Sequence, residues 1–140
     1  MAGIEAGGPQ DQGLRQYLRL IARTLGVDLE SCWYECDPDA TAYIALDQRV
    51  PRHPDHDLAL LWDEHTGWCA GIEVGRGADL LPLTYLGPPV LPPPEAVTVF
   101  VSDLVAGRPP DRPEPPAMPA EAHLGDLLVE YADHAPAAVL

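Results

Sequence analysis

Residues 58–87, LALLWDEHTGWCAGIEVGRGADLLPLTYLG, decide the fold of this chain. Three short apolar runs follow one another, separated by turns at residues 63–67 and 75–77. Apolar runs of this length between turn residues predict antiparallel strands joined by hairpins. The stretch holds two of the three tryptophans, and it contains no recognisable catalytic constellation. It therefore indicates structure more firmly than function.

The first hairpin has a well-specified register. Strands at 57–63 and 68–74 place large apolar residues opposite one another on one face: Trp62 with Trp68, Leu60 with Ala70, and Leu58 with Ile72. Such cross-strand pairs are the unit of sheet stabilisation. Because a slip of one residue would turn every side chain to the other face, this pattern specifies the pairing.

Further strands are predicted on both sides of the hairpin, at 31–37, 41–47 and 79–86. Pro82 lies inside the last of these and favours an edge strand or a bulge there, since proline donates no ladder hydrogen bond. Consecutive strands with short connections predict an antiparallel meander.

Two amphipathic helices flank the strands. One spans residues 11–25; the other begins near Pro93 or Pro94 and ends at Gly107. We expect their apolar stripes to cover the face that carries Trp62 and Trp68. The predicted fold is a two-layer α+β sandwich, a five-stranded antiparallel meander with an N-terminal and a C-terminal helix on one face, plus a linked C-terminal helix. The stripes are Leu14, Leu18, Ile21 and Leu25 in the first helix, and Ala96, Val97, Phe100, Val101, Leu104 and Val105 in the second.

The second face of the predicted sheet is too apolar to meet water directly. We expect a second copy of the protein, the C-terminal helix or a partner to cover it. Its residues are Tyr43, Ala45, Ala59, Leu61, Cys69 and Gly71.

The ends of the chain differ in composition from the domain at 11–107. Residues 1–10 are rich in glycine and are predicted to be disordered, while residues 108–119 carry six prolines and are predicted to form a solvated, extended linker. An amphipathic segment follows at 120–134 and docks either on its own domain or in a partner's groove. Its apolar positions are Leu124, Leu127, Leu128 and Tyr131.

The net charge of −14 has a compositional origin, because the chain contains neither lysine nor asparagine. The joint absence of two residues with A/T-rich codons indicates a GC-rich genome. An acidic field repels phosphate groups, so we expect no nucleic-acid and no membrane partner. The chain has an odd number of cysteines, Cys32, Cys36 and Cys69, and its N-terminal residues show no signal-peptide pattern. Both observations predict reduced thiols and a cytoplasmic location.

The polar loop at 48–57 and the hairpin tip at 63–67 offer the residue types of a reactive site. His53 and His56 with Asp55 or Asp57 have the chemistry of a metal site, but they need a further ligand such as Asp63 or His65. The alternatives are a solvated connector and a mobile flap that contacts a ligand. Asp63, Glu64 and His65 also invite an acid–base interpretation, although turns collect polar residues anyway. We predict no bound metal and no cofactor.

Arg15, Arg19 and Arg23 lie four residues apart and form one stripe on the first helix. Two interpretations stay open. The stripe is either a solvated face that pairs with nearby carboxylates, or a site for an anion or an acidic partner.

Several segments together resemble a known family. YLRLIARTLGV, TAYIALDQRVP, DLALLWDEHTGWCAGIEV, a strand that ends YLG, and the helix start PPPEAV are similar to a small family of actinobacterial proteins known as a domain of unknown function. The resemblance covers residues 14–107 and excludes both tails. It implies the domain limits and a GC-rich bacterial origin, and it implies no activity.

The first functional hypothesis is a non-enzymatic, protein-binding or regulatory module with a protein partner or a homodimer mate. It acts through the second sheet face and the tail, at Tyr43, Leu61, Cys69, Leu124, Leu127, Leu128 and Tyr131. The alternative is a small-molecule-binding protein or enzyme with a pocket between the 48–57 loop and the 63–67 tip, formed by Arg52, His53, His56, Asp63, Glu64 and His65. The first hypothesis predicts a complex in solution, and the second requires the loop and the tip to converge.

Overall fold

The computed structural model describes residues 8–36, 39–74, 80–108, 110, 112–116 and 124–133. The predicted turn at 75–77 and most of the predicted N-terminal tail lie outside these residues. The elements, in chain order, are α1 (Pro9–Leu25), η1 (Leu29–Ser31), β1 (Cys32–Glu35), β2 (Thr41–Ala45), β3 (Leu58–Asp63), β4 (Gly67–Glu73), β5 (Leu80–Tyr85), α2 (Pro94–Val105) and α3 (Leu124–Asp133).

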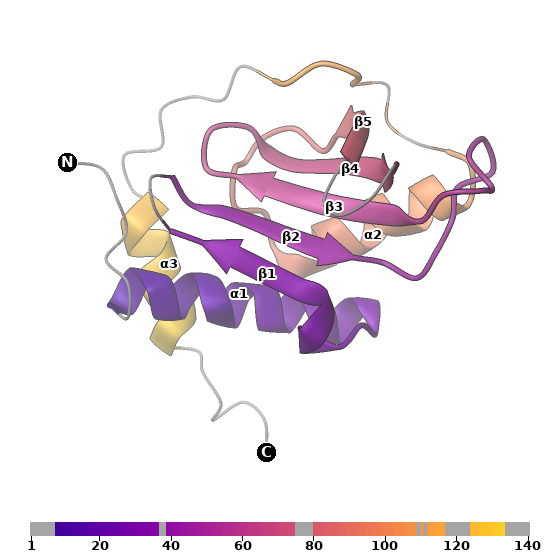
Figure 1. The fold of residues 1–140 in the computed structure, drawn as a ribbon. Helices are drawn as coiled ribbons and strands as arrows, with labels where there is room; N and C mark the ends of the chain where they lie inside the picture. Colours follow the sequence, from indigo (N-terminus) through magenta and orange to yellow (C-terminus); the bar gives the residue numbers. More distant parts are fainter. Residues whose placement is uncertain are drawn as a thin grey trace.

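The five strands form one antiparallel sheet in the order β1-β2-β3-β4-β5 (Figure 1). The predicted hairpin register is confirmed, because Trp62 pairs with Trp68, and Leu60 with Ala70. The register between β4 and β5 shifts at Ala70/Gly71, where Pro82 faces Gly71. Pro82 therefore lies on an edge strand and next to a bulge, and both are positions that tolerate a missing N–H.

α1 and α2 lie on the same face of the sheet, as predicted, and enclose the core between the layers (Figure 1). Trp62, Trp68, Leu58 and Leu60 contribute the sheet side of this core, and each is fully buried. The helices add most of the predicted stripes together with Tyr17, which is also fully buried, whereas Val105 at the end of the second stripe is 36% exposed. The predicted α+β class and the linked C-terminal helix are confirmed.

Tyr17 supplies the polar connection between the layers. Its hydroxyl donates to Pro92 O and accepts from Trp68 Nε1–H at 3.1 Å. The other core indole, Trp62 Nε1–H, donates to Val90 O at 2.6 Å. These bonds satisfy the polar groups of buried aromatic residues, and they fasten the proline-rich segment before α2 to the core.

α3 docks on α1 of the same chain and crosses its N-terminal half (Figure 1). The helices approach so closely at Gly13 that a Cβ there would lie 1.6 Å from Leu128 O. Leu128 is fully buried, and the Tyr131 ring meets the Tyr17 ring edge-on at 4.9 Å. The apolar side of α3 therefore packs against its own domain. Leu128 is not available to a partner in this arrangement.

The proline-rich segment after α2 differs from the predicted solvated linker. Tyr85 N–H donates to Arg112 O at 2.9 Å, and Thr84 Oγ1 donates to Pro110 O at 2.6 Å. Residues 110 and 112 thus run along β5 and are held there. The cause is that β5 is an edge strand whose outer backbone groups need partners.

Candidate functional site

The pocket predicted between the 48–57 loop and the 63–67 tip does not form. The loop precedes β3 and the tip follows it, so the two lie at opposite ends of this six-residue strand. A strand of that length separates its ends by roughly 17 Å. Arg52, His53 and His56 therefore belong to one end of the sheet, and Asp63, Glu64 and His65 belong to the other.

The hairpin tip contacts the residues that precede β2. His65 Nε2 lies 3.3 Å from Asp39 Oδ1, and Glu64 Oε1 accepts a 2.6 Å hydrogen bond from Ala40 N–H. The hydrogen bond to Asp39 raises the pKa of His65. The His65 and Asp39 side chains are 63% and 50% exposed, so this cluster ties two turns together in solvent and does not form an enclosed acid–base site.

The loop is held by its own arginine. Arg49 Nε lies 3.1 Å from Asp57 Oδ1, and Arg49 Nη1–H donates to Pro54 O at 2.7 Å. Within the residues that the structure describes, His53 and His56 do not join a set of three potential metal ligands. Among the described residues, the hypothesis of a metal site at His53 and His56 therefore finds no third ligand.

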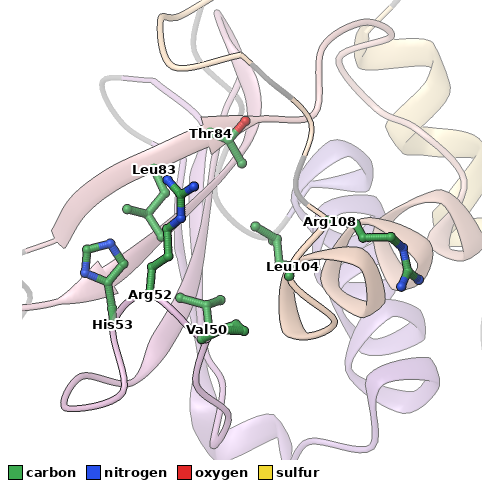
Figure 2. Close-up of a pocket in the computed structure, with 9 residues that line it drawn as sticks. Val50, Arg52, His53, Leu83, Thr84, Leu104 and Arg108 are labelled. Atoms are coloured by element: carbon green, nitrogen blue, oxygen red, sulfur yellow. The ribbon is translucent and has the colours of Figure 1, made fainter.

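Arg52 and His53 instead line a cleft of about 540 Å³ between the loop, β5 and the C-terminal end of α2 (Figure 2). Arg52 reaches from the loop toward Leu83, whereas Arg108 turns away toward Asp103, 3.6 Å from its Nη2. The floor is apolar. Its lining residues are Val50, Pro51, Leu83, Thr84, Leu104 and Gly107, none of which the sequence hypothesis had included.

The second face of the sheet is covered largely by its own side chains. Tyr43 Oη–H donates to Glu73 Oε2 at 2.6 Å, a bond that crosses from β2 to β4 over Ala59. A Cβ at Gly71 would lie 2.8 Å from Leu80 Cγ, so Leu80 covers that glycine. Ala59 and Cys69 are accordingly buried, whereas Tyr43, Ala45 and Leu61 are partly exposed. The expectation that a separate layer must cover this face is wrong for its centre.

The β5 edge of the sheet is closed. Pro82 removes a backbone donor, and the bulge opposite it bends the strand. Residues 110 and 112 bind the C-terminal end of β5 through Thr84 and Tyr85, and Arg112 N–H donates back to Thr84 Oγ1 at 3.2 Å. Within the described residues, this edge therefore presents no uninterrupted run of backbone donors and acceptors along the whole strand.

The β1 edge is open. In the part of the chain that the structure describes, β1 pairs with β2 alone, and it contains no proline and no bulge. Trp33 stands on the outer face of this strand, 56% exposed, with its ring centroid 5.7 Å from that of Tyr43. We call the outer side of β1, with Trp33, the open edge.

A groove runs beside the open edge on the inner side, between β1 and α1. It has a volume of about 210 Å³, and we call it the α1–β1 groove. The Nε of Arg19 is buried without a hydrogen-bond partner, and none of the ion pairs among the described residues involves Arg15 or Arg19. Arg23 is not part of the groove. The lining residues are Arg15, Leu18, Arg19, Leu29, Cys32 and Tyr34.

The sequence predicted the α1 side of this groove but not its contact with β1. The spacing of Arg15 and Arg19 placed them on one helix face, but nothing linked that face to β1. The one signal was the alternation in β1, which puts Cys32 and Tyr34 opposite Trp33 and Glu35. An inward polar tyrosine on an edge strand marks a boundary between core and solvent.

The two thiols and the phenol near the groove have raised pKa values. Burial raises the pKa of the Cys32 thiol, and burial together with Asp11 raises the pKa of Cys36 to about 11. Burial and a hydrogen bond with Asp11 raise the pKa of Tyr34 to about 12. These groups are protonated at neutral pH, and the Tyr34 hydroxyl is engaged by Asp11, so the groove offers two guanidinium groups and an apolar wall for binding.

The fold and this site define a small α+β module with one closed and one open sheet edge. The chain belongs to a family of unknown function, DUF6292, whose model matches residues 17–103. That match lies within the span 14–107 of the resemblance seen in the sequence. No curated protein and no solved structure matches the chain. Among the described residues, no helix has the length and apolar character to cross a membrane.

Proposed function

We propose that this protein is a non-enzymatic binding module that accepts an extended segment of a partner protein at the open edge. The observation that carries the proposal is the contrast between the two sheet edges, because β5 is closed by the chain itself and β1 is not. An extended segment that adds to an exposed edge gains main-chain hydrogen bonds and presents alternate side chains to the two faces.

Trp33 supports the proposal independently. A large aromatic side chain that is more than half exposed, on a strand whose outer edge has no partner among the described residues, has the character of an interface hot spot. Its contact with Tyr43 holds the ring in place, so little side-chain entropy is lost when a partner covers it. Of the residues first suggested for binding, Tyr43 and Leu61 stay candidates, whereas Cys69 and Leu128 are buried.

The role that we propose for α3, in the C-terminal segment, differs from the one predicted from the sequence. Because α3 packs on α1, we assign α3 to the stability of the module and place the partner site at the open edge instead. The actinobacterial origin implied by the resemblance and the cytoplasmic location inferred from composition stay predictions.

A displayed library of random peptides tests strand addition directly. The full chain serves as bait, and the affinity of enriched peptides is measured by titration calorimetry. We expect Trp33→Lys to weaken binding by about tenfold or more, because it removes the aromatic surface and places a charge at the edge. Val99→Lys is the matched control, since Val99 is 58% exposed and belongs to α2 rather than to the sheet.

Three outcomes would contradict the proposal. The first is a selection that enriches no peptide, and the second is a set of peptides that bind the Trp33→Lys protein and the original protein equally. The third is a homodimer that Trp33→Lys converts to a monomer, which would assign the open edge to a second copy. Thermal unfolding of both variants checks that each is folded.

The cleft beside the 48–57 loop supports a second candidate function, the binding of a small anionic molecule. The supporting observation is Arg52, which reaches into an apolar cleft and forms no ion pair with the described residues. Thermal-shift screening of small carboxylates and phosphates tests it. We expect stabilisation that Arg52→Gln abolishes and that Arg23→Gln leaves intact; a shift that survives Arg52→Gln would reject the cleft as the site.

A further inference from the structure

We infer that the α1–β1 groove is a carboxylate pocket, which receives a glutamate or aspartate side chain from the segment added at the open edge. This inference rests on the proposed function, and it names the chemistry that the partner must carry. The partner segment then has an acidic side chain that points into the groove and apolar neighbours that lie against Trp33.

The position of the groove follows from strand geometry. Successive side chains of a strand point to opposite faces of the sheet. A segment paired with β1 therefore directs one set of side chains to the outer face, beside Trp33, and the other set inward, above α1. The inward set meets the groove lined by Arg15, Arg19 and Tyr34.

The charges of the groove select a carboxylate. Arginine donates through a planar fork that matches carboxylate geometry, and a buried donor without a partner is costly. Arg19 Nε is such a donor, and the Arg19 side chain lines the groove together with that of Arg15. A carboxylate placed in the groove meets two positive charges within a chain whose net charge is −14.

Backbone pairing alone does not explain recognition at this edge. β1 has only four residues, so an added segment forms few ladder hydrogen bonds. Affinity and specificity must then come from the side chains on its two faces, which are an apolar contact on Trp33 and an ion pair in the groove.

A second copy of the chain does not supply the required carboxylate. When the β1 strands of two copies pair into one continuous antiparallel sheet, the helix-covered inner faces of both copies lie on the same side, and so do their outer faces. The inward residues of β1 are Cys32 and Tyr34, and its acidic residue, Glu35, points outward with Trp33. The groove therefore fits a different segment better than it fits β1 of another copy.

The chain's own α3 does not occupy the groove either. At about 100° per residue, Arg15 and Arg19 lie about 200° around α1 from Gly13 and Tyr17, which contact α3. The groove and the α3 contact are thus on opposite sides of the same helix.

Nuclear magnetic resonance tests the pocket without a peptide. The probe is N-acetylglutamate N-methylamide, with N-acetylglutamine N-methylamide as the neutral match, and the readout is the Nε–Hε signals of the arginines. We expect a saturable shift of the Arg15 and Arg19 signals with the acid alone. Arg23, one turn further along the same stripe and outside the groove, is the internal control. A uniform shift of all arginines, or no shift, would overturn the inference.

A double-mutant cycle tests the pocket in the complex. Peptides enriched on the full chain are compared with versions in which each acidic residue is replaced by its amide. We expect Arg19→Gln to weaken the acidic peptide about tenfold and to leave the amide peptide unchanged, whereas Arg23→Gln changes neither.

The outcomes separate the two proposals. Peptides that need Trp33 but show no preference for an acidic residue would overturn the carboxylate pocket and leave strand addition in place. Saturable acid binding at Arg19 without any enriched peptide would support the pocket and overturn strand addition.

Discussion

The two edges of the sheet are built in opposite ways. At β5, Pro82 and a bulge in the β4–β5 pairing interrupt the strand, and residues 110 and 112 bond to the outer side of its C-terminal end. At β1, no strand of the described residues pairs with the outer side. An exposed Trp33 and the α1–β1 groove flank this edge. The same contrast divides α1, which packs against α3 on one side and lines the groove on the other.

This difference teaches where stability and binding reside. Unpaired strand edges are templates for other chains, and proteins that do not use them cover them. Here one edge is covered by the chain and the other is left with an aromatic ring and two arginines beside it. Mutations on the closed side should therefore lower the free energy of unfolding, and mutations on the open side should lower partner affinity.

The largest effect on the closed side is expected from Gly13→Ala. The new Cβ would meet Leu128 O, a backbone atom that cannot move without α3. Separating the helices exposes Leu128, so we expect a loss of about 2–4 kcal/mol in the free energy of unfolding. Urea denaturation measures it, and hydrogen exchange should show α3 opening first. Gly125→Ala is the matched control, because its Cβ would meet only the flexible Gln10 side chain; equal losses in both variants would refute the explanation.

Tyr17→Phe should follow, with a loss of about 1–3 kcal/mol. The change leaves Pro92 O and Trp68 Nε1–H without their partner inside the core. Guanidinium denaturation gives the value, with Tyr85→Phe as the comparison, since the Tyr85 side chain lies on the partly exposed second face. A Tyr17→Phe protein as stable as the Tyr85→Phe protein would show that these bonds contribute no net stability.

Thr84→Val should open the closed edge at a cost of about 1 kcal/mol. The replacement is nearly isosteric, and it removes the hydroxyl that bonds to Pro110 O and Arg112 N–H. Faster amide exchange at Tyr85 and increased self-association at high concentration are the expected signs. Thr98→Val on α2 supplies the control; unchanged exchange at Tyr85 would mean that residues 110 and 112 are held by other contacts.

The smallest effect on stability is expected from Arg19→Gln on the open side, within about 0.5 kcal/mol. The original Nε has no hydrogen-bond partner to lose, so the chain folds equally well without it. Thermal unfolding measures the change, and the peptide titrations show whether affinity falls while stability does not. A loss as large as that of Thr84→Val would make Arg19 a structural residue and would remove the contrast between the edges.

Local patterns were sufficient to predict the sheet. The register of β3 and β4 followed from the Trp62–Trp68 match, because side chains alternate with a period of two along a strand. Pro82 signalled both the edge and the bulge, since a residue without an N–H is tolerated only there. The two helical stripes indicated the face that the helices cover.

Longer-range relations were not accessible in the same way. Loop 48–57 and the 63–67 tip were grouped by composition, although the strand between them holds them apart. The docking of α3 depends on Gly13, whose role becomes visible only when Leu128 lies against it. The coverage of the second face depends on the Tyr43–Glu73 bond across three strands, which no local pattern reveals.

The sequence by itself determined the elements, their order, the hairpin register and the arginine stripe, because these depend on neighbours along the chain. The tertiary structure alone decided which sheet edge is closed, which side of α1 carries α3, and that Arg15 and Arg19 line a groove beside β1. The physical reason is that an edge, a groove and a helix contact are properties of surfaces brought together by packing. Their energies arise between residues that are distant in the chain.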